Sequence, residues 1–199
     1  MSFRATFTPL TPPVQAVKPL QRFEEVLEKT FGTAPQNVVA LLGDDGSKVR
    51  RAENLARIVD KASDILKARR IKVTEPASLS IVEPILLAAA PESRDELQDI
   101  WARLLAAAAD PVRAKAFRNT FIQVAKQMDL LDAAVLDIAR LANGPITEES
   151  RNDFATQLHA LRDEVDISLV NLVKLELLTG SPKVEISPLG REFLRAVLD

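Results

Sequence analysis

The chain has 199 residues, of which 47% are hydrophobic and 27% charged, with a formal net charge of −2, as in an ordinary globular protein of one large or two small domains. The absence of cysteine and the single histidine exclude every cysteine-based mechanism and most transition-metal sites. No apolar run of about 18 residues predicts a membrane span, and the first residues lack the apolar segment of a signal peptide, so we expect a cytoplasmic protein.

The first part of the chain is predicted to be an arm followed by helices. Prolines recur in the first 20 residues, which favours an extended arm over residues 1–21 ahead of a helical region over residues 22–128. A short helix is predicted from Arg22 to Phe31, and an apolar helical turn over residues 36–43. A long amphipathic helix is predicted from about Ser47 to Arg70. Its apolar row comprises Leu55, Ile58, Val59, Ala62, Ile65 and Leu66.

The stretch from Ser93 to Pro111 is predicted to be a buried central helix. Ser93 and Glu96 have the spacing of a capping box, and Asp110 before Pro111 favours a stop. Apolar residues recur at helical spacing between these ends and include the single tryptophan. The predicted core residues, including two from the next helix, are Leu97, Ile100, Trp101, Leu104, Leu105, Phe117 and Phe121.

Two further helices are predicted to flank the central one. Ser80 and Glu83 repeat the capping-box spacing at the start of a short helix over residues 81–90. After Pro111 another helix is expected, with an inward face made by Phe117, Phe121, Val124 and Met128. Residues 22–128 are therefore expected to form a helical bundle with short connections.

Residues 129–199 are predicted to form a separate winged-helix-like unit. The expected elements are helices over Leu130–Leu141, from Thr147 through Val165 and over Ser168–Leu178, a strand over Val184–Ile186, and a helix starting at Ser187–Pro188. This is the order of elements in a winged helix. The predicted fold class is mainly α, with a helical N-terminal region packed on a small C-terminal winged-helix-like unit that has one short β-wing.

Three blocks of the sequence resemble a known family. They are SRDELQDIWARLLAAAADP with FRNTFIQVAKQMDLLDAAVL, then SLVNLVKLELLTG with VEISPLGREFL, and LLGDDGSKVRRAENLARIVDKASDIL. Together they span roughly residues 38–198, and they resemble the abortive infection alpha proteins of bacteria. This chain has Ala107 where the family often has asparagine. The resemblance implies a role in phage defence, and it supplies no catalytic residues.

A cation-rich helix is the first candidate contact surface. Nine cations lie from Lys48 to Lys72 against three acidic residues. Such a stripe can bind phosphates, acidic lipid or an acidic protein. The simpler interpretation is a solvated surface with Glu53–Arg57 and Asp64–Lys67 ion pairs, and no aromatic residues interleave as in single-strand binders. The candidate contact residues are Arg50, Arg51, Arg57 and Lys61.

The winged-helix-like unit is the second candidate surface. Residues 129–199 carry 7 Lys and Arg against 13 Asp and Glu, a net charge of −6, whereas residues 1–128 carry +4. A helix over residues 168–178 would enter the major groove in that geometry, but the sign of the charge disfavours DNA. We therefore expect a protein partner or a second copy here, with Asn171 and Lys174 on the contact surface. The alternative function is a nucleic-acid-binding regulator that uses the basic helix over residues 48–72, the winged-helix-like unit, or both.

No pattern in the sequence predicts an active site. His159 lies four residues before Asp163, but no Ser or Cys motif accompanies this pair. Clustered carboxylates fall at helix starts, where they interact favourably with the helix dipole. The sequence also lacks a glycine-rich phosphate loop. We therefore predict no catalytic residue, cofactor or metal, and a non-enzymatic interaction module of the abortive-infection type that acts through protein–protein contacts.

Overall fold

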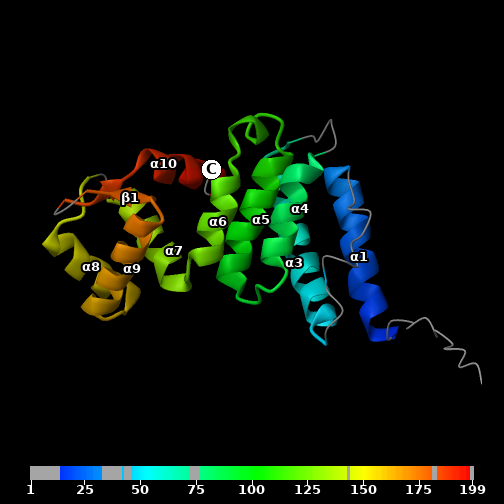
Figure 1. Cartoon of the computed structure of the whole chain (residues 1–199), viewed down its shortest axis with the longest axis horizontal. Coiled ribbons are helices and arrows are strands. Elements are labelled where there is room, and N and C mark those ends of the chain that lie inside the picture. The colour runs from blue at the N-terminus through cyan, green and yellow to red at the C-terminus, as the bar shows by residue number, and fades with distance from the viewer. Residues whose placement is uncertain are drawn as a thin grey trace, which may run out of the picture.

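The helices lie side by side in a row that runs from α1 at one end to α8 and α9 at the other (Figure 1). The computed structural model describes residues 14–32, 42, 46–71, 77–142, 144–180 and 183–197. The elements are α1 (Val14–Phe31), α3 (Lys48–Ala68), α4 (Leu79–Ala89), α5 (Asp95–Ala109), η1 (Ala114–Ala116), α6 (Asn119–Gln127), α7 (Leu130–Leu141), α8 (Glu148–Leu158), α9 (Arg162–Lys174), β1 (Leu178–Thr179), β2 (Glu185–Ile186) and α10 (Pro188–Val197).

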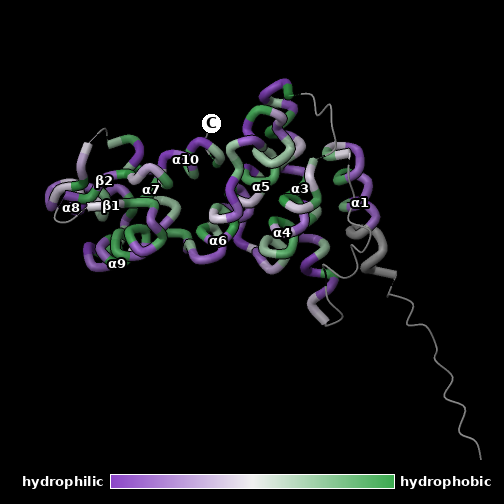
Figure 2. Tube along the Cα trace, turned by 45° about the horizontal axis from the view of Figure 1, so that its top comes forward, coloured by the Kyte–Doolittle hydropathy of each residue, from purple (hydrophilic) through white to green (hydrophobic). Residues whose placement is uncertain are grey.

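The described residues are mainly helical, with one small two-stranded sheet. Strands β1 and β2 are antiparallel, with Leu178 opposite Ile186. Hydrophobic and hydrophilic segments alternate along each helix, as expected where one face of a helix is buried (Figure 2). Among the described helices, none has the length and hydropathy needed to cross a membrane.

The first helix begins earlier than predicted. Helix α1 starts at Val14 rather than Arg22, so residues 14–21 are helical and do not belong to an extended arm. Its row of Phe23, Leu27 and Phe31 is fully buried and packs on α3. The rest of the predicted arm, residues 1–13, and the predicted turn over residues 36–43, except Leu42, lie outside the described residues.

Both predicted capping boxes in the helical region are wrong. Helix α4 begins at Leu79, so Ser80 lies inside the first turn, and its hydroxyl oxygen is 2.8 Å from that of Ser78. Helix α5 begins at Asp95 after Arg94, with no side-chain cap. The Arg94 N–H instead donates to Glu92 Oε1 at 2.9 Å. The Glu92–Arg94 ion pair therefore holds the backbone before α5, in place of the capping box predicted for Ser93 and Glu96.

Helix α5 lies at the centre of the molecule, with α3, α4, α6, α7 and α10 packed around it (Figure 1). Leu97, Trp101, Leu104 and Leu105 are buried, and so is Phe121 of α6. Ile100 and Phe117 are half-buried and pack against the same core. The long predicted helix over residues 47–70 corresponds to α3, whose predicted apolar row is buried except for the half-buried Ile65.

The segment between α5 and α6 departs from the prediction of one helix after Pro111. The Asp110 carboxylate accepts the Val112 N–H at 2.8 Å, which starts a turn, and the short helix η1 follows. Helix α6 therefore begins only at Asn119. Phe117 lies before it and contacts Phe121 edge to face, with ring centroids 5.7 Å apart.

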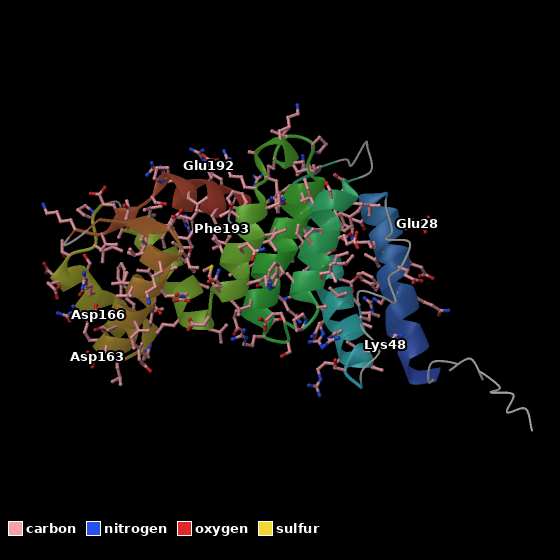
Figure 3. All side chains as sticks on the ribbon, in the orientation of Figure 1. Glu28, Lys48, Asp163, Asp166, Glu192 and Phe193 are labelled. Carbon is pink, nitrogen blue, oxygen red and sulfur yellow. The ribbon has the colours of Figure 1, made fainter. Side chains whose placement is uncertain are left out.

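Helix α10 packs back onto the helical region. Phe193 is fully buried and meets Phe121 edge to face at 5.8 Å. In Figure 3 Phe193 lies on the inner side of α10, whereas Glu192 lies on its outer side. The start of α10 follows the prediction, since the Gly190 N–H donates to Ser187 Oγ at 2.8 Å. The predicted boundary at residue 128 falls between α6 and α7, and α10 crosses back over it.

The two helices after α7 are divided differently from the prediction. Helix α7 has the predicted bounds, and Thr147 caps α8 by accepting the Ser150 N–H at 3.3 Å. The predicted helix from Thr147 through Val165 ends at Leu158, because His159 adopts a left-handed conformation with a φ of 52°. Helix α9 then begins at Arg162, six residues before Ser168. The Glu164 carboxylate accepts the Leu161 N–H at 2.7 Å and so caps this start.

Candidate interaction surfaces

The predicted cation stripe on α3 is partly neutralised by α5. Lys61 Nζ lies 2.7 Å from Asp95 Oδ1 and 2.6 Å from Asp99 Oδ1. Burial disfavours the charged amine, but hydrogen bonds to both carboxylates outweigh this and raise the Lys61 pKa. Lys61 therefore joins α3 to α5 and is not available to a phosphate or an acidic partner in this arrangement.

The other cations of α3 divide into paired and free side chains. Arg51 donates to the Leu42 carbonyl at 2.9 Å, and the predicted Asp64–Lys67 pair is present at 2.9 Å. The predicted Glu53–Arg57 pair is absent from the described part of the chain. Arg50 and Arg57 are exposed and have no hydrogen bond or ion pair to any described residue. Of the four candidate contact residues, Arg50 and Arg57 thus remain without a partner among the described residues; Lys72 lies outside them.

Of the two predicted contact residues on α9, Asn171 is engaged within the fold. Its Nδ2 atom donates to Asp132 Oδ2 of α7 at 2.7 Å and lies 3.4 Å from the Gln127 carbonyl oxygen. Asn171 therefore ties α9 to the start of α7. Lys174 is exposed, and it has no partner among the residues that the structure describes.

Asp132 is a buried carboxyl at the junction of α7 and α9. Its side chain is 1% exposed and accepts the Asp129 N–H at 3.0 Å in a reciprocal cap. Burial is the largest influence and raises the Asp132 pKa above its ordinary 3.8, although hydrogen bonds from Asp129, Asn171 and Ser168 oppose it. The structure thus places a titratable group where α7 contacts α9.

We expect the titration of Asp132 to make the free energy of unfolding depend on pH in the acid range. Because its folded pKa is raised, the native chain binds a proton more readily than the unfolded chain, so stability falls as pH rises from about 3.8. In Asp132→Asn this dependence is absent. The difference in unfolding free energy, wild type minus variant, should decrease over that pH range in denaturant melts.

Asp132→Ala should lower the free energy of unfolding by about 1–3 kcal/mol, because the buried donors around Asp132 lose their acceptor.

Asp137 lies on the same helix with its side chain 49% exposed, and it provides the control. It pairs with Arg140 at 2.9 Å on the surface. Asp137→Asn should not reproduce the pH-dependent difference. A constant difference between wild type and Asp132→Asn from pH 3 to pH 7 would contradict the raised pKa.

Helix α9 also has an exposed apolar face that the sequence analysis missed. Ile167 is 69% exposed, Val170 54% and Val173 37%. The opposite face, with Val165, Leu169 and Leu172, is buried. The signal was present in the sequence, because two sets of apolar residues at helical spacing recur along residues 162–174. The predicted start at Ser168 left Ile167 outside the helix, so the exposed apolar row was not recognised.

The structure describes His159 and most of the carboxylate clusters named in the sequence. His159 is exposed, and no hydrogen bond or ion pair joins it to Asp163. Asp95 and Asp99 bind Lys61, and Glu148 pairs with Arg162 at 2.5 Å. Asp44 and Asp45 lie outside the described residues. No group of three or more potential metal ligands is found in the described part of the chain.

A hollow of about 340 Å³ lies between α5, η1, α6 and α10. Ala107, Phe117 and Phe121 form part of its lining, with Arg113 and Arg195 beside them. Both arginines are engaged, since Arg113 Nη1 donates to the Arg195 carbonyl and Arg195 pairs with Glu192. Ala107 therefore adds only a methyl group to a lining that also includes charged side chains.

A model of the abortive infection alpha family matches residues 50–184. The match runs from α3 to Val184, next to β2, and covers more than half of the 199 residues. It leaves out Pro188, Leu189 and Gly190, which the sequence analysis included in the resemblance. No curated protein and no solved structure matches the chain significantly. The chain therefore belongs to the abortive infection alpha family.

Proposed function

We propose that the protein is a non-enzymatic interaction module in phage defence and acts through protein contacts of its C-terminal unit. Family membership supports a role of the abortive-infection type. The observation that carries the contact surface is the exposed apolar face of α9, at Ile167, Val170 and Val173. Apolar side chains at the centre of a surface favour a protein partner, because burying them on binding is favourable.

The order of elements from α7 to α10 supports a winged-helix-like unit in this proposal. In that arrangement α9 is the helix that would meet a nucleic acid. Its exposed side chains are instead largely apolar or acidic, and residues 129–199 carry a net charge of −6. Since phosphate neutralisation supplies most non-specific affinity for DNA, a protein partner fits this helix better.

The proposal is tested by a plaque assay in a bacterial host that expresses the chain. Wild type is expected to reduce phage plaques, and Ile167→Asp is expected to abolish this protection. Leu141→Asp is the matched control, because Leu141 is 59% exposed at the end of α7. Thermal melts should show that both variants fold. Equal protection by wild type and Ile167→Asp would overturn the proposed surface.

A nucleic-acid-binding regulator is the second candidate, and it is favoured by Arg50 and Arg57, which are exposed and have no partner among the described residues. A titration with DNA and RNA at two salt concentrations separates the two candidates. Affinity that falls steeply with salt and is lost in the Arg50→Glu, Arg57→Glu double variant would favour this function. Lys61 does not belong in this test, because its reversal would break the contacts with Asp95 and Asp99.

A further inference from the structure

Four exposed residues form a straight seam along α9. Asp163, Ile167, Val170 and Lys174 are spaced by four, three and four residues, which is the spacing of the contact positions in a coiled coil. All four side chains are exposed, and the two apolar ones lie in the middle. Asp163 places a negative charge at the N-terminal end of the seam, and Lys174 places a positive charge at its C-terminal end.

We propose that this seam binds the same seam on a second copy of the chain, with the two α9 helices antiparallel. The two-fold axis passes between residues 168 and 169. This inference deepens the proposed function, since it rests on the same surface and names its partner.

The charges at the two ends select both the partner and its direction. In the antiparallel pair, Asp163 lies opposite Lys174 of the partner subunit at each end, and Ile167 lies opposite Val170 of the partner subunit. All four contacts come from one register, because each pair is equally distant from the axis. A parallel pair would place Asp163 against the same residue of its partner, and Lys174 likewise, so that like charges repel.

The seam is free within the described part of the monomer. Asp163 and Lys174 have no hydrogen bond or ion pair to a described residue. Neighbouring charges are engaged elsewhere: Arg162 Nε donates to Asp166 Oδ2 at 3.1 Å, and Glu164 caps the helix. Helix α9 lies at the end of the molecule opposite α1, and Figure 3 shows Asp163 and Asp166 at this end.

The length of the seam indicates how strongly two chains should associate. From Asp163 to Lys174 it spans about 16 Å at the rise of an α-helix. This is a small contact, and interfaces below about 1,200 Å² in total are typically weak and transient. Self-association should therefore be reversible and should increase with protein concentration.

The first experiment measures the mass of the full chain by analytical ultracentrifugation over a concentration series. Wild type should shift from monomer to dimer, and Ile167→Asp should remain monomeric while Leu141→Asp behaves as wild type. Asp163→Lys and Lys174→Asp should each weaken dimerisation by about tenfold or more, equivalent to about 1.4 kcal/mol. The double variant restores opposite charges across the axis and should recover the dimer.

The second experiment tests direction by cross-linking, which the absence of cysteine in the chain makes unambiguous. A mixture of Asp163→Cys chains and Lys174→Cys chains should form a disulfide between the two variants under mild oxidation. Asp163→Cys alone should not, because its two sulfurs would lie about 16 Å apart along the antiparallel pair, beyond disulfide reach. Efficient bridging of Asp163→Cys to itself would overturn the antiparallel arrangement.

The outcomes separate this inference from the proposed function. A wild-type chain that stays monomeric up to about 1 mM overturns self-association. If Ile167→Asp then still loses protection against phage, the proposed surface stands and its partner is a different protein. If the chain dimerises as described but Ile167→Asp protects fully, the inference stands and the proposed function fails.

Discussion

Replacing Trp101 with alanine is expected to lower the free energy of unfolding by about 3–5 kcal/mol. Trp101 is 3% exposed on α5, the helix on which α3, α4, α6, α7 and α10 pack. Truncation removes the largest side chain of this helix and leaves a cavity that rigid neighbouring helices cannot close. Urea unfolding followed by circular dichroism measures the loss, since Trp101 is the single tryptophan and its removal eliminates the fluorescence signal.

Val112→Ala is the matched control for this prediction. Val112 follows the same helix but is 78% exposed, so its truncation should change stability by about 0.5 kcal/mol or less. A loss below about 1 kcal/mol for Trp101→Ala would show that the α5 centre is not close-packed.

Gly190→Ala is expected to destabilise the protein by about 3 kcal/mol, at the upper end of the cost of overpacking. A Cβ atom at Gly190 would lie 2.1 Å from the Leu177 carbonyl oxygen and 3.0 Å from Ile186 Cγ2. The Leu177 oxygen belongs to the backbone and already accepts the Ser187 N–H at 3.0 Å, so it cannot move freely. The clash would therefore separate α10 from the β1–β2 hairpin.

The sign of this effect makes the test decisive. Without a clash, alanine would stabilise a helical position relative to glycine by about 1 kcal/mol. Gly144→Ala is the control, because the nearest atom to its added Cβ is the Ala142 oxygen at 3.9 Å. Thermal and urea melts should show a large loss for Gly190→Ala and little change for Gly144→Ala. A stabilised Gly190→Ala would mean that α10 does not approach the hairpin closely.

Gly190 also explains part of the sequence motif that contributed to the family resemblance. In Pro188-Leu189-Gly190 the proline occupies the first helical position, and the glycine lets the backbone of α10 approach Leu177. The sequence predicted the start of the helix at Ser187–Pro188. It did not indicate why glycine is needed two residues later, because the atom that excludes a side chain is the carbonyl oxygen of Leu177, which directly precedes β1 and is distant from Gly190 along the chain.

The sequence by itself determined the mainly helical class, the bounds of α7 and the buried row of α3. These features depend on apolar periodicity and on helix stop signals. Both involve residues close together in the sequence, so they can be predicted from it. The same local reasoning misplaced the starts of α4, α5 and α9. Serine and glutamate at capping-box spacing predict a cap, but α4 and α5 begin without a side-chain cap, and α9 is capped by Glu164.

Only the tertiary structure decided which candidate side chains are free. Lys61 is paired with Asp95, which is 34 residues away, and Asn171 is bonded to Asp132, which is 39 residues away. No pattern on one helix reveals such partners, because they lie on other helices that are distant along the chain. The seam on α9 also depends on tertiary packing. Helices α7 and α8 contact α9 and cover its opposite face, which leaves Ile167 and Val170 exposed.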